Sequence, residues 1–358
     1  MIFTRQTQAI NSMKPELERY SRQVLFSELG EAGQTRLMQG RVLLCGCGAL
    51  GTVLAETLVR AGVGQLKIVD RDFVELSNLQ RQVLFDETDV AARLPKAIAA
   101  AEKLKKINSE VRIEAIVEDI DHTNILALAK DVDLILDGTD NFEVRYLIND
   151  VSLELGIPWI YCGCIGSTGQ TMTILPGKSA CLRCLIDSAP EPGSTETCDT
   201  AGILGPTVNV IASFEAINAI KILAGREDLI KPVLTVVDVW EGTLRQMSVA
   251  DLREKAGCKA CHQGERIWLK GEQGSRTTRL CGRNAVQVSP AEKGRISFED
   301  LAKKLQHSGT VDYNAYLLRL NLKNPDFEIS LFRDGRAIIK GTDDPAVAKT
   351  IYARYIGS

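Results

Sequence analysis

The sequence predicts an α/β fold: a doubly wound, mostly parallel sheet with an antiparallel extension, followed by a small α+β domain. Three observations support this prediction. A strand, a glycine-rich turn, a helix and a second strand follow one another between residues 42 and 69. Strand and helix patterns then alternate as far as residue 166, which is typical of a parallel sheet covered by helices on both faces. Beyond a polar stretch at 263–283, the pattern changes to short strands and two helices.

The composition indicates a soluble globular protein of the cytoplasm that acts on a small molecule or a protein. Its 358 residues, 45% of them hydrophobic, suffice for one large domain and an appendage. No apolar run matches a signal peptide or a membrane span. The formal net charge of −3, with both signs mixed, argues against nucleic acid or anionic lipid as a partner. Ten cysteines without an export signal should be reduced, so closely spaced pairs indicate metal or redox sites before disulfides.

The first strand, turn, helix and strand together predict a nucleotide site. Residues 46–51 read Gly-Cys-Gly-Ala-Leu-Gly, and the second strand ends at Asp70. Glycines let the backbone approach a ligand, the helix start offers N–H groups to phosphate, and an acidic residue at this place can bind ribose hydroxyls. We therefore expect a nucleotide to contact Gly46, Gly48, Gly51 and Asp70.

The remaining elements follow from the periodicity of apolar residues. In the large domain we expect helices at 97–108, 124–131, 143–156 and 207–225, parallel strands at 111–120, 132–141 and 158–166, and antiparallel strands at 169–177 and 233–249. In the small domain we expect strands at 284–290, 316–323 and 327–341 and helices at 297–309 and 344–357. The domain boundaries are then an N-terminal extension at 1–18, the large domain at 19–262, a linker at 263–283 and the small domain at 284–358.

Polar residues after the second strand favour a triphosphate over a nicotinamide dinucleotide. Ser77, Asn78 and Arg81 lie where the strands of a doubly wound sheet end, and a fixed guanidinium suits a departing pyrophosphate. Lys96, at the start of a helix, adds a second positive charge. For either cation alone, a solvated surface charge would be the simpler interpretation.

Two carboxylates lie around the end of a buried strand, Asp137 and Asp140. Carboxylates at such a place can hold Mg²⁺ against phosphates. Asp137 can equally cap or brace the turn, so Asp140 at the exposed tip is the stronger magnesium candidate.

The cysteine spacing predicts a structural zinc site. Two Cys-x-x-Cys pairs, about seventy residues apart, supply four thiolates and close a tetrahedral shell: Cys181, Cys184, Cys258 and Cys261. The alternatives are a redox pair or free buried thiols. Cys198 is then a fifth thiol without a coordination place, at the end of a loop with two prolines and a glycine.

The chain resembles the MoeB/ThiF family of ubiquitin-activating-type adenylyltransferases, which have a Rossmann-like core. The resemblance covers about residues 16–262 and rests on segments that occur in the family's order: ERYSRQVLF, RVLLCGCGALGTVLAETLVRAGVG, DRDFVELSNLQRQ, LDGTDNFEVR, CLRC, TCDTAGILGP and GCKACH. The family includes the molybdopterin-synthase adenylyltransferase and its counterpart in thiamine thiazole synthesis. The small domain has no match in the better-known members.

The resemblance implies an enzyme that binds MgATP and the C-terminal Gly-Gly tail of a ubiquitin-like sulfur-carrier protein. The tail carboxylate would attack the α-phosphate, which gives an acyl-adenylate and pyrophosphate. The positions that match the family's ATP contacts are Gly48, Ala49, Asp70, Asn78, Arg81, Lys96 and Asp140, the last also as a Mg²⁺ ligand. Many relatives have glycine in place of Ala49, which matters little for a backbone N–H contact.

The resemblance also implies partners. Arg22 matches an arginine that reaches the triphosphate of a neighbouring subunit, so a homodimer is expected. Cys198 matches a candidate nucleophile that forms a thioester or persulfide link with the activated carrier. The alternative is a tolerated exposed cysteine, because adenylation needs no thiol. A cysteine desulfurase or another sulfur donor is a further expected partner.

Two other functions stay open from the sequence. An NAD-linked oxidoreductase would use the same glycine turn, although three histidines leave few candidates for hydride transfer. A non-catalytic zinc scaffold would keep the fold, although the intact set Arg22, Asn78, Arg81, Lys96 and Asp140 argues against it. For the small domain, carrier docking or dimer support is the default expectation, with Cys281 as a candidate sulfur-relay thiol.

Overall fold

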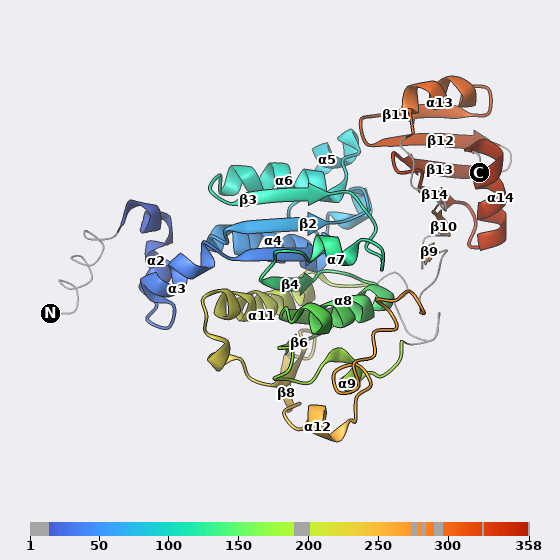
Figure 1. Ribbon diagram of the computed structural model, residues 1–358. Coiled ribbons are helices and arrows are strands. Elements are labelled where there is room, and N and C mark those ends of the chain that lie inside the picture. The colour runs from blue at the N-terminus through green and yellow to red at the C-terminus, as the bar shows by residue number, and fades with distance from the viewer. Residues whose placement is uncertain are drawn as a thin grey trace. The chain divides into compact units, whose positions relative to one another are not determined.

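The computed structural model describes residues 14–189, 201–273, 278–280, 284–289, 296–323 and 326–356 (Figure 1). These residues form two compact units, one ending at Gln273 and one made mainly of the residues after it. None of the described helices has both the length and the hydropathy needed to span a lipid bilayer.

The first unit is built on a sheet whose eight described strands have the order β3-β2-β1-β4-β5-β6-β7-β8. The strands are β1 (Arg41–Cys45), β2 (Gln65–Val69), β3 (Arg112–Ile116), β4 (Leu134–Asp137), β5 (Trp159–Ile165), β6 (Thr168–Ile174), β7 (Val233–Asp238) and β8 (Thr243–Ser248). Strands β1 to β5 pair in parallel, and β6 to β8 are added antiparallel. The predicted doubly wound sheet with an antiparallel extension is confirmed.

The strand order reverses between β1 and β4. From β1 the chain proceeds outward to β2 and β3, and then returns to place β4 on the other side of β1. In open α/β sheets, ligands bind at the carboxyl ends of the strands beside such a reversal. The topology therefore predicts a ligand site at the carboxyl ends of β1 and β4.

Helices cover both faces of this sheet. One apolar core packs α4 (Ala49–Ala61), α6 (Lys96–Ile107) and α11 (Gly205–Leu223) on one face. The other packs α7 (Ile125–Leu128), α8 (Phe142–Leu155) and α9 (Leu182–Leu185) on the opposite face. Because both faces are covered, the central strands are buried on both sides, as the continuous apolar runs of β1 and β4 indicate.

Shorter elements complete the first unit. They are η1 (Pro15–Tyr20), α2 (Ser21–Val24), α3 (Gly30–Leu37), η2 (Leu76–Asn78), α5 (Glu87–Ala92), η3 (Glu227–Leu229) and α12 (Leu252–Lys255). Gln23 on α2 donates to the carbonyl of Ala61 at 3.0 Å, so α2 packs beside the segment that leads into β2.

The second unit is an antiparallel sheet with two helices on one face, which confirms the predicted α+β class. Its described strands have the order β11-β12-β13-β14-β10-β9. They are β9 (Thr278–Leu280), β10 (Ala285–Val288), β11 (Thr310–Tyr313), β12 (Leu317–Lys323), β13 (Asp326–Phe332) and β14 (Ala337–Lys340). Helices α13 (Phe298–Leu305) and α14 (Pro345–Tyr355) share an apolar core with the sheet. The side chains of Ser297 and Asp344 cap their N-termini.

The long helix α11 places a carboxyl group inside the first unit. Glu215 is fully buried, and neither carboxylate oxygen has an ordinary hydrogen-bond partner among the described residues. Burial raises the pKa of Glu215 well above its ordinary value, and the charge of nearby Asp137 raises it further. Contacts with the Cys162 thiol and with the backbone at Asp137 lower the pKa and offset only part of this effect.

We predict that Glu215→Gln stabilises the protein in mildly alkaline solution. The pKa of Glu215 is higher in the folded state than in the unfolded state, so the wild-type chain loses stability as the pH rises between these two values. The amide of the variant does not titrate and avoids this loss. The gain should be about 1–3 kcal/mol at about pH 8 and much smaller at about pH 5. Thermal unfolding at both pH values measures it, with the exposed Glu254→Gln as the control. Equal destabilisation of the Glu215 variant at both pH values would contradict the prediction.

Candidate functional site

The glycine turn lies at the reversal point of the sheet, pressed against the end of β4. Gly46 has a φ of +89°, and a Cβ added to it would lie 2.7 Å from the carbonyl oxygen of Gly138. A Cβ on Gly51 would lie 2.2 Å from the carbonyl oxygen of Gly46. No side chain caps the start of α4 at Gly48, so the first N–H groups of this helix are free to bind an anion.

Asp70 is bonded directly to the glycine turn. One carboxylate oxygen accepts the Cys47 N–H at 2.6 Å, and the other accepts the Asp72 N–H at 2.7 Å. Burial raises the pKa of Asp70, and the positive charge of Lys96 opposes this effect. The structure therefore brings Asp70, Lys96 and the turn together at one edge of the sheet.

The other predicted phosphate ligands follow β2. Asn78, on η2, is 2% exposed, and its side-chain oxygen accepts the Glu75 N–H at 3.1 Å. Arg81 is half-buried and donates to the Ser77 carbonyl at 2.9 Å, while the Ser77 side chain is exposed. Both side chains thus make local hydrogen bonds, and Arg81 is only partly exposed.

Lys96 differs most from a simple surface cation. Its side chain is only 4% exposed, and its ammonium lies 3.1 Å from a carboxylate oxygen of Asp72. Asp72 was not among the residues singled out by the sequence, because its partner lies 24 positions further along the chain.

The two carboxylates after β4 have different roles. Asp137 is fully buried, accepts from the Thr139 hydroxyl at 2.7 Å, and lies 3.0 Å from the Nε of Arg145. Arg145 also donates to the Thr139 carbonyl at 2.7 Å. Asp137 therefore braces the turn. Asp140 is exposed at the tip of the turn, two residues before the start of α8.

Arg22 does not join this group within its own chain. It is exposed on α2, whose neighbour Gln23 contacts the segment that leads into β2. This is the amino-terminal end of the strand, opposite to the end at which Asp70 follows. Any contact between Arg22 and a nucleotide would therefore have to be made in another subunit.

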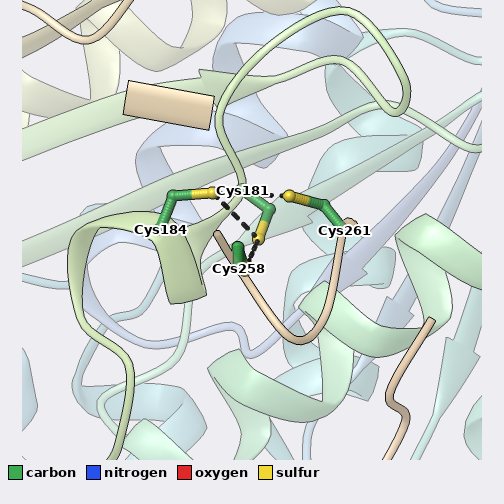
Figure 2. A group of neighbouring side chains, drawn as sticks. All are labelled: Cys181, Cys184, Cys258 and Cys261. Atoms are coloured by element: carbon green, nitrogen blue, oxygen red, sulfur yellow. Dashed lines mark hydrogen bonds between the residues drawn. The ribbon is translucent and has the colours of Figure 1, made fainter. Parts of the chain in front are cut away.

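The four cysteines of the two pairs form one cluster, shown in Figure 2. Their sulfur atoms lie within 4.8 Å of one another, with neighbouring sulfurs at 3.8, 3.6 and 3.4 Å. Tetrahedral zinc with bonds of about 2.3 Å places its sulfurs about 3.8 Å apart, so the cluster fits the ion. Four protein ligands leave no open position, which makes the site structural. Cys198 and Cys281 lie outside the described residues.

Residues 265–269, which we call the strap, follow the last zinc cysteine and lie along α8. The Trp268 ring stacks on Tyr146 with the centroids 5.1 Å apart. The N–H groups of Trp268 and Leu269 donate to one carboxylate oxygen of Asp150 at 3.0 and 3.3 Å. The polar composition had predicted a linker from residue 263, whereas the strap packs against the first unit.

The strap follows a single face of α8. Arg266 lies 3.3 Å from Glu154, and the contacting helix residues are spaced four apart: Tyr146, Asp150 and Glu154. Residues four apart lie one above the other on a helix. This spacing is visible in the sequence, but it does not identify the distant segment that it contacts.

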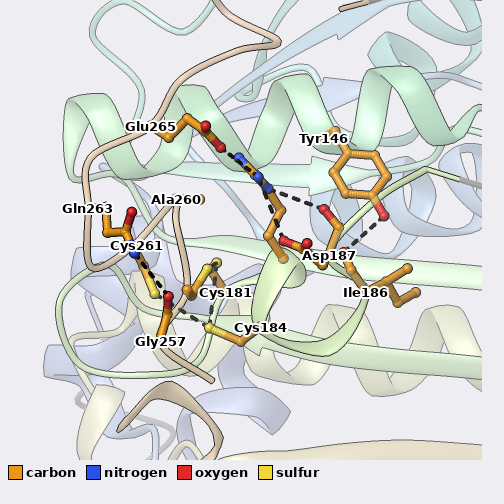
Figure 3. Close-up of polar contacts among 12 residues, drawn as sticks. Tyr146, Cys181, Cys184, Ile186, Asp187, Gly257, Ala260, Cys261, Gln263 and Glu265 are labelled. Carbon is orange, nitrogen blue, oxygen red and sulfur yellow. Dashed lines mark hydrogen bonds and ion pairs between the residues drawn. The ribbon is translucent and has the colours of Figure 1, made fainter. Parts of the chain in front are cut away.

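Arg183 connects the zinc cluster to the strap. It lies between the cysteines of the first pair, its side chain is 4% exposed, and it is 2.7 Å from the carboxylate of Glu265. The Tyr146 hydroxyl donates to the Ile186 carbonyl at 3.0 Å, just beyond the same pair (Figure 3). The segments that follow the two cysteine pairs are therefore both held against α8.

A cavity of about 600 Å³ lies at the other edge of the sheet. Its lining includes residues at the amino-terminal ends of the strands, among them Arg41, Asp133 and Pro158. Arg41 and Asp133 form an ion pair at 3.0 Å across it. Since the glycine turn is at the opposite edge, this cavity is not part of the nucleotide site.

We predict that the strap slows the loss of zinc. Trp268→Ala and Glu265→Gln should each speed zinc transfer to a chromogenic chelator about tenfold, because groups that support metal ligands preorganise the site. Trp268→Phe should retain most of the effect by keeping a stacked ring. Glu56→Gln, at an exposed ion pair on α4, is the control. Identical release rates for all these variants would show that the strap does not support the cluster.

Comparisons with known proteins agree with this geometry. The ThiF family model matches residues 20–261. The sulfur carrier protein ThiS adenylyltransferase of Bacillus subtilis is 44% identical over 340 residues, covering 95% of this chain and 99% of the relative. The SAMP-activating enzyme E1 of Haloferax volcanii is 36% identical over 249 residues, covering 70% and 90%. A crystal structure of E. coli MccB with ATP superposes with a TM-score of 0.57 at 26% identity, covering 65% and 71%.

The family match includes the glycine turn and all four cysteines of the cluster, together with the polar residues at the carboxyl ends of the strands: Asp70, Asn78, Arg81, Lys96 and Asp140. The match to the Bacillus subtilis relative extends through most of the second unit. The resemblance inferred from the sequence motifs is confirmed: this chain belongs to the ThiF family.

Proposed function

We propose that this chain is an ATP-dependent adenylyltransferase that activates the C-terminal carboxylate of a ubiquitin-like sulfur-carrier protein. The observation that supports this most directly is the set of groups at one edge of the sheet. The free N–H groups at the start of α4 and the cations Arg81 and Lys96 suit a triphosphate, and Asp140 suits its magnesium ion. Family membership favours ATP over NAD as the nucleotide.

The chemistry requires positioning and charge stabilisation more than proton transfer. A carboxylate oxygen of the carrier attacks the α-phosphorus, the bond to the bridging oxygen of the β-phosphate breaks, and pyrophosphate leaves with that electron pair. The carrier carboxyl is already ionised near neutral pH, so no general base is needed. Negative charge grows on the pyrophosphate, where Arg81 and Lys96 would stabilise it. Asp70 and Asn78 would hold the ribose and phosphate ends of the nucleotide.

The proposed enzyme acts as a homodimer. Arg22 is exposed and away from the turn of its own chain, so it would serve the triphosphate of the partner subunit. Such an arrangement makes each site incomplete without the second copy.

We favour a carrier of the thiamine type over one of the molybdopterin type. The relative that covers 95% of this chain, second unit included, is the ThiS adenylyltransferase of Bacillus subtilis. Recognition of a Gly-Gly tail remains part of this proposal. So does the role of Cys198, whose thiolate would attack the acyl carbon and release AMP to form a thioester.

Exchange of labelled pyrophosphate into ATP tests the proposed function. Exchange should require a sulfur carrier with its Gly-Gly tail and should be absent with a carrier that lacks these two residues. Arg81→Ala should slow it about 100-fold, since it removes a group that stabilises the leaving charge.

The control is Arg41→Ala, a cation at the opposite edge of the sheet, which should leave exchange unchanged. Exchange that proceeds equally with the truncated carrier would contradict carboxylate activation. Tight binding of NAD in place of MgATP in calorimetry would revive the oxidoreductase alternative, and unaltered exchange by Arg81→Ala would exclude the assigned phosphate contact.

A further inference from the structure

Lys96 and Asp72 form an ion pair near the carboxyl ends of the parallel strands. The Lys96 side chain is 4% exposed and that of Asp72 is 20% exposed, with 3.1 Å between ammonium and carboxylate. A lysine is seldom buried without a fixed partner, because desolvating its charge is costly. Asp72 also lies 3.8 Å from the Nε of Arg71. The pair with Asp72 is therefore one of the contacts that hold this ammonium in place.

The backbone supports the pair from both sides. The Lys96 N–H donates to the Asp72 carbonyl at 2.9 Å, and the Val74 N–H donates to the Leu94 carbonyl at 3.0 Å. Phe73 and Pro95 form an antiparallel bridge between these bonds. The segment after β2 and the start of α6 are thus joined like two short strands, with the Lys96–Asp72 ion pair at one end.

The same pair is connected to the glycine turn. The Asp72 N–H donates to Asp70, whose other carboxylate oxygen accepts the Cys47 N–H within the turn. The charge of Lys96 lowers the pKa of both Asp70 and Cys47, against the larger effect of burial. The ammonium is therefore close to the place where phosphates are expected.

We infer that Asp72 is a positioning residue that fixes the Lys96 ammonium for the adenylation step. An ammonium has three N–H donors, so it can donate to a carboxylate and to a phosphate oxygen at the same time. Asp72 itself need not touch the nucleotide. A cation that is oriented in advance stabilises developing charge without reorganisation during the reaction, and this should appear in kcat more than in ATP affinity. The inference rests on the proposed adenylyltransferase function.

A double-mutant cycle on pyrophosphate exchange tests this inference. Asp72→Ala should lower kcat about 10- to 100-fold and change the KM for ATP less than about threefold. Asp72→Asn keeps an acceptor oxygen but not the charge, so its kcat should lie between those of the wild type and Asp72→Ala. In a Lys96→Ala background, Asp72→Ala should cause less than about a twofold further loss, because its effect passes through Lys96.

Thermal unfolding of each variant and the remote control Asp133→Ala separate this role from a structural one. Two results would overturn the inference: a wild-type kcat in Asp72→Ala, or a loss of kcat from Asp72→Ala that is equally large with and without Lys96. In either case, pyrophosphate exchange by the wild-type enzyme would leave the proposed function intact. If Asp72→Ala fails to fold, the same cycle with Asp72→Asn decides. Absence of exchange by the wild-type enzyme would overturn the proposed function and this inference with it.

Discussion

The close approach of two backbone turns, at Gly46 and Gly138, is the constraint on which the nucleotide site depends. A Cβ at either glycine would lie 2.7 Å or less from a carbonyl oxygen of the other. This contact brings the end of β1 and the start of α4 to the end of β4, so the free helix N–H groups and Asp140 lie at one edge of the sheet. Arg145 supports the turn after β4, since it pairs with Asp137 and donates to the Thr139 carbonyl.

Helix α8 connects this site to the zinc cluster. It begins at Phe142, two residues after Asp140, and further along the same helix Tyr146, Asp150 and Glu154 contact the strap. Asn149 also accepts the Leu182 N–H at 2.9 Å, between the cysteines of the first pair. A single helix therefore supports both the magnesium candidate and the segments that carry the four thiols. The cysteine cluster is one of several connections in this region, together with the Arg183–Glu265 ion pair and the Trp268 stack.

The sequence was informative where one local motif determines both structure and chemistry. The glycine turn, the two Cys-x-x-Cys pairs and the alternation of strands and helices each appear within a few residues, and the fold followed from them. The pairings of Lys96 with Asp72 and of Trp268 with Asp150 could not be predicted, because they join residues 24 and 118 positions apart. Polar residues of this kind resemble surface residues until the fold supplies their partners. The burial of Glu215 could not be predicted either, because it lies in a helix that the sequence pattern identified only as apolar.

We propose that the nucleotide binds at the carboxyl ends of β1 and β4. Hydrogen–deuterium exchange with and without a non-hydrolysable ATP analogue and Mg²⁺ tests it most directly. We expect slower exchange of the backbone amides at 46–52, 70–82 and 138–141, with little change at the cavity beside Arg41 and Asp133. Protection at that cavity, with none at the glycine turn, would contradict it.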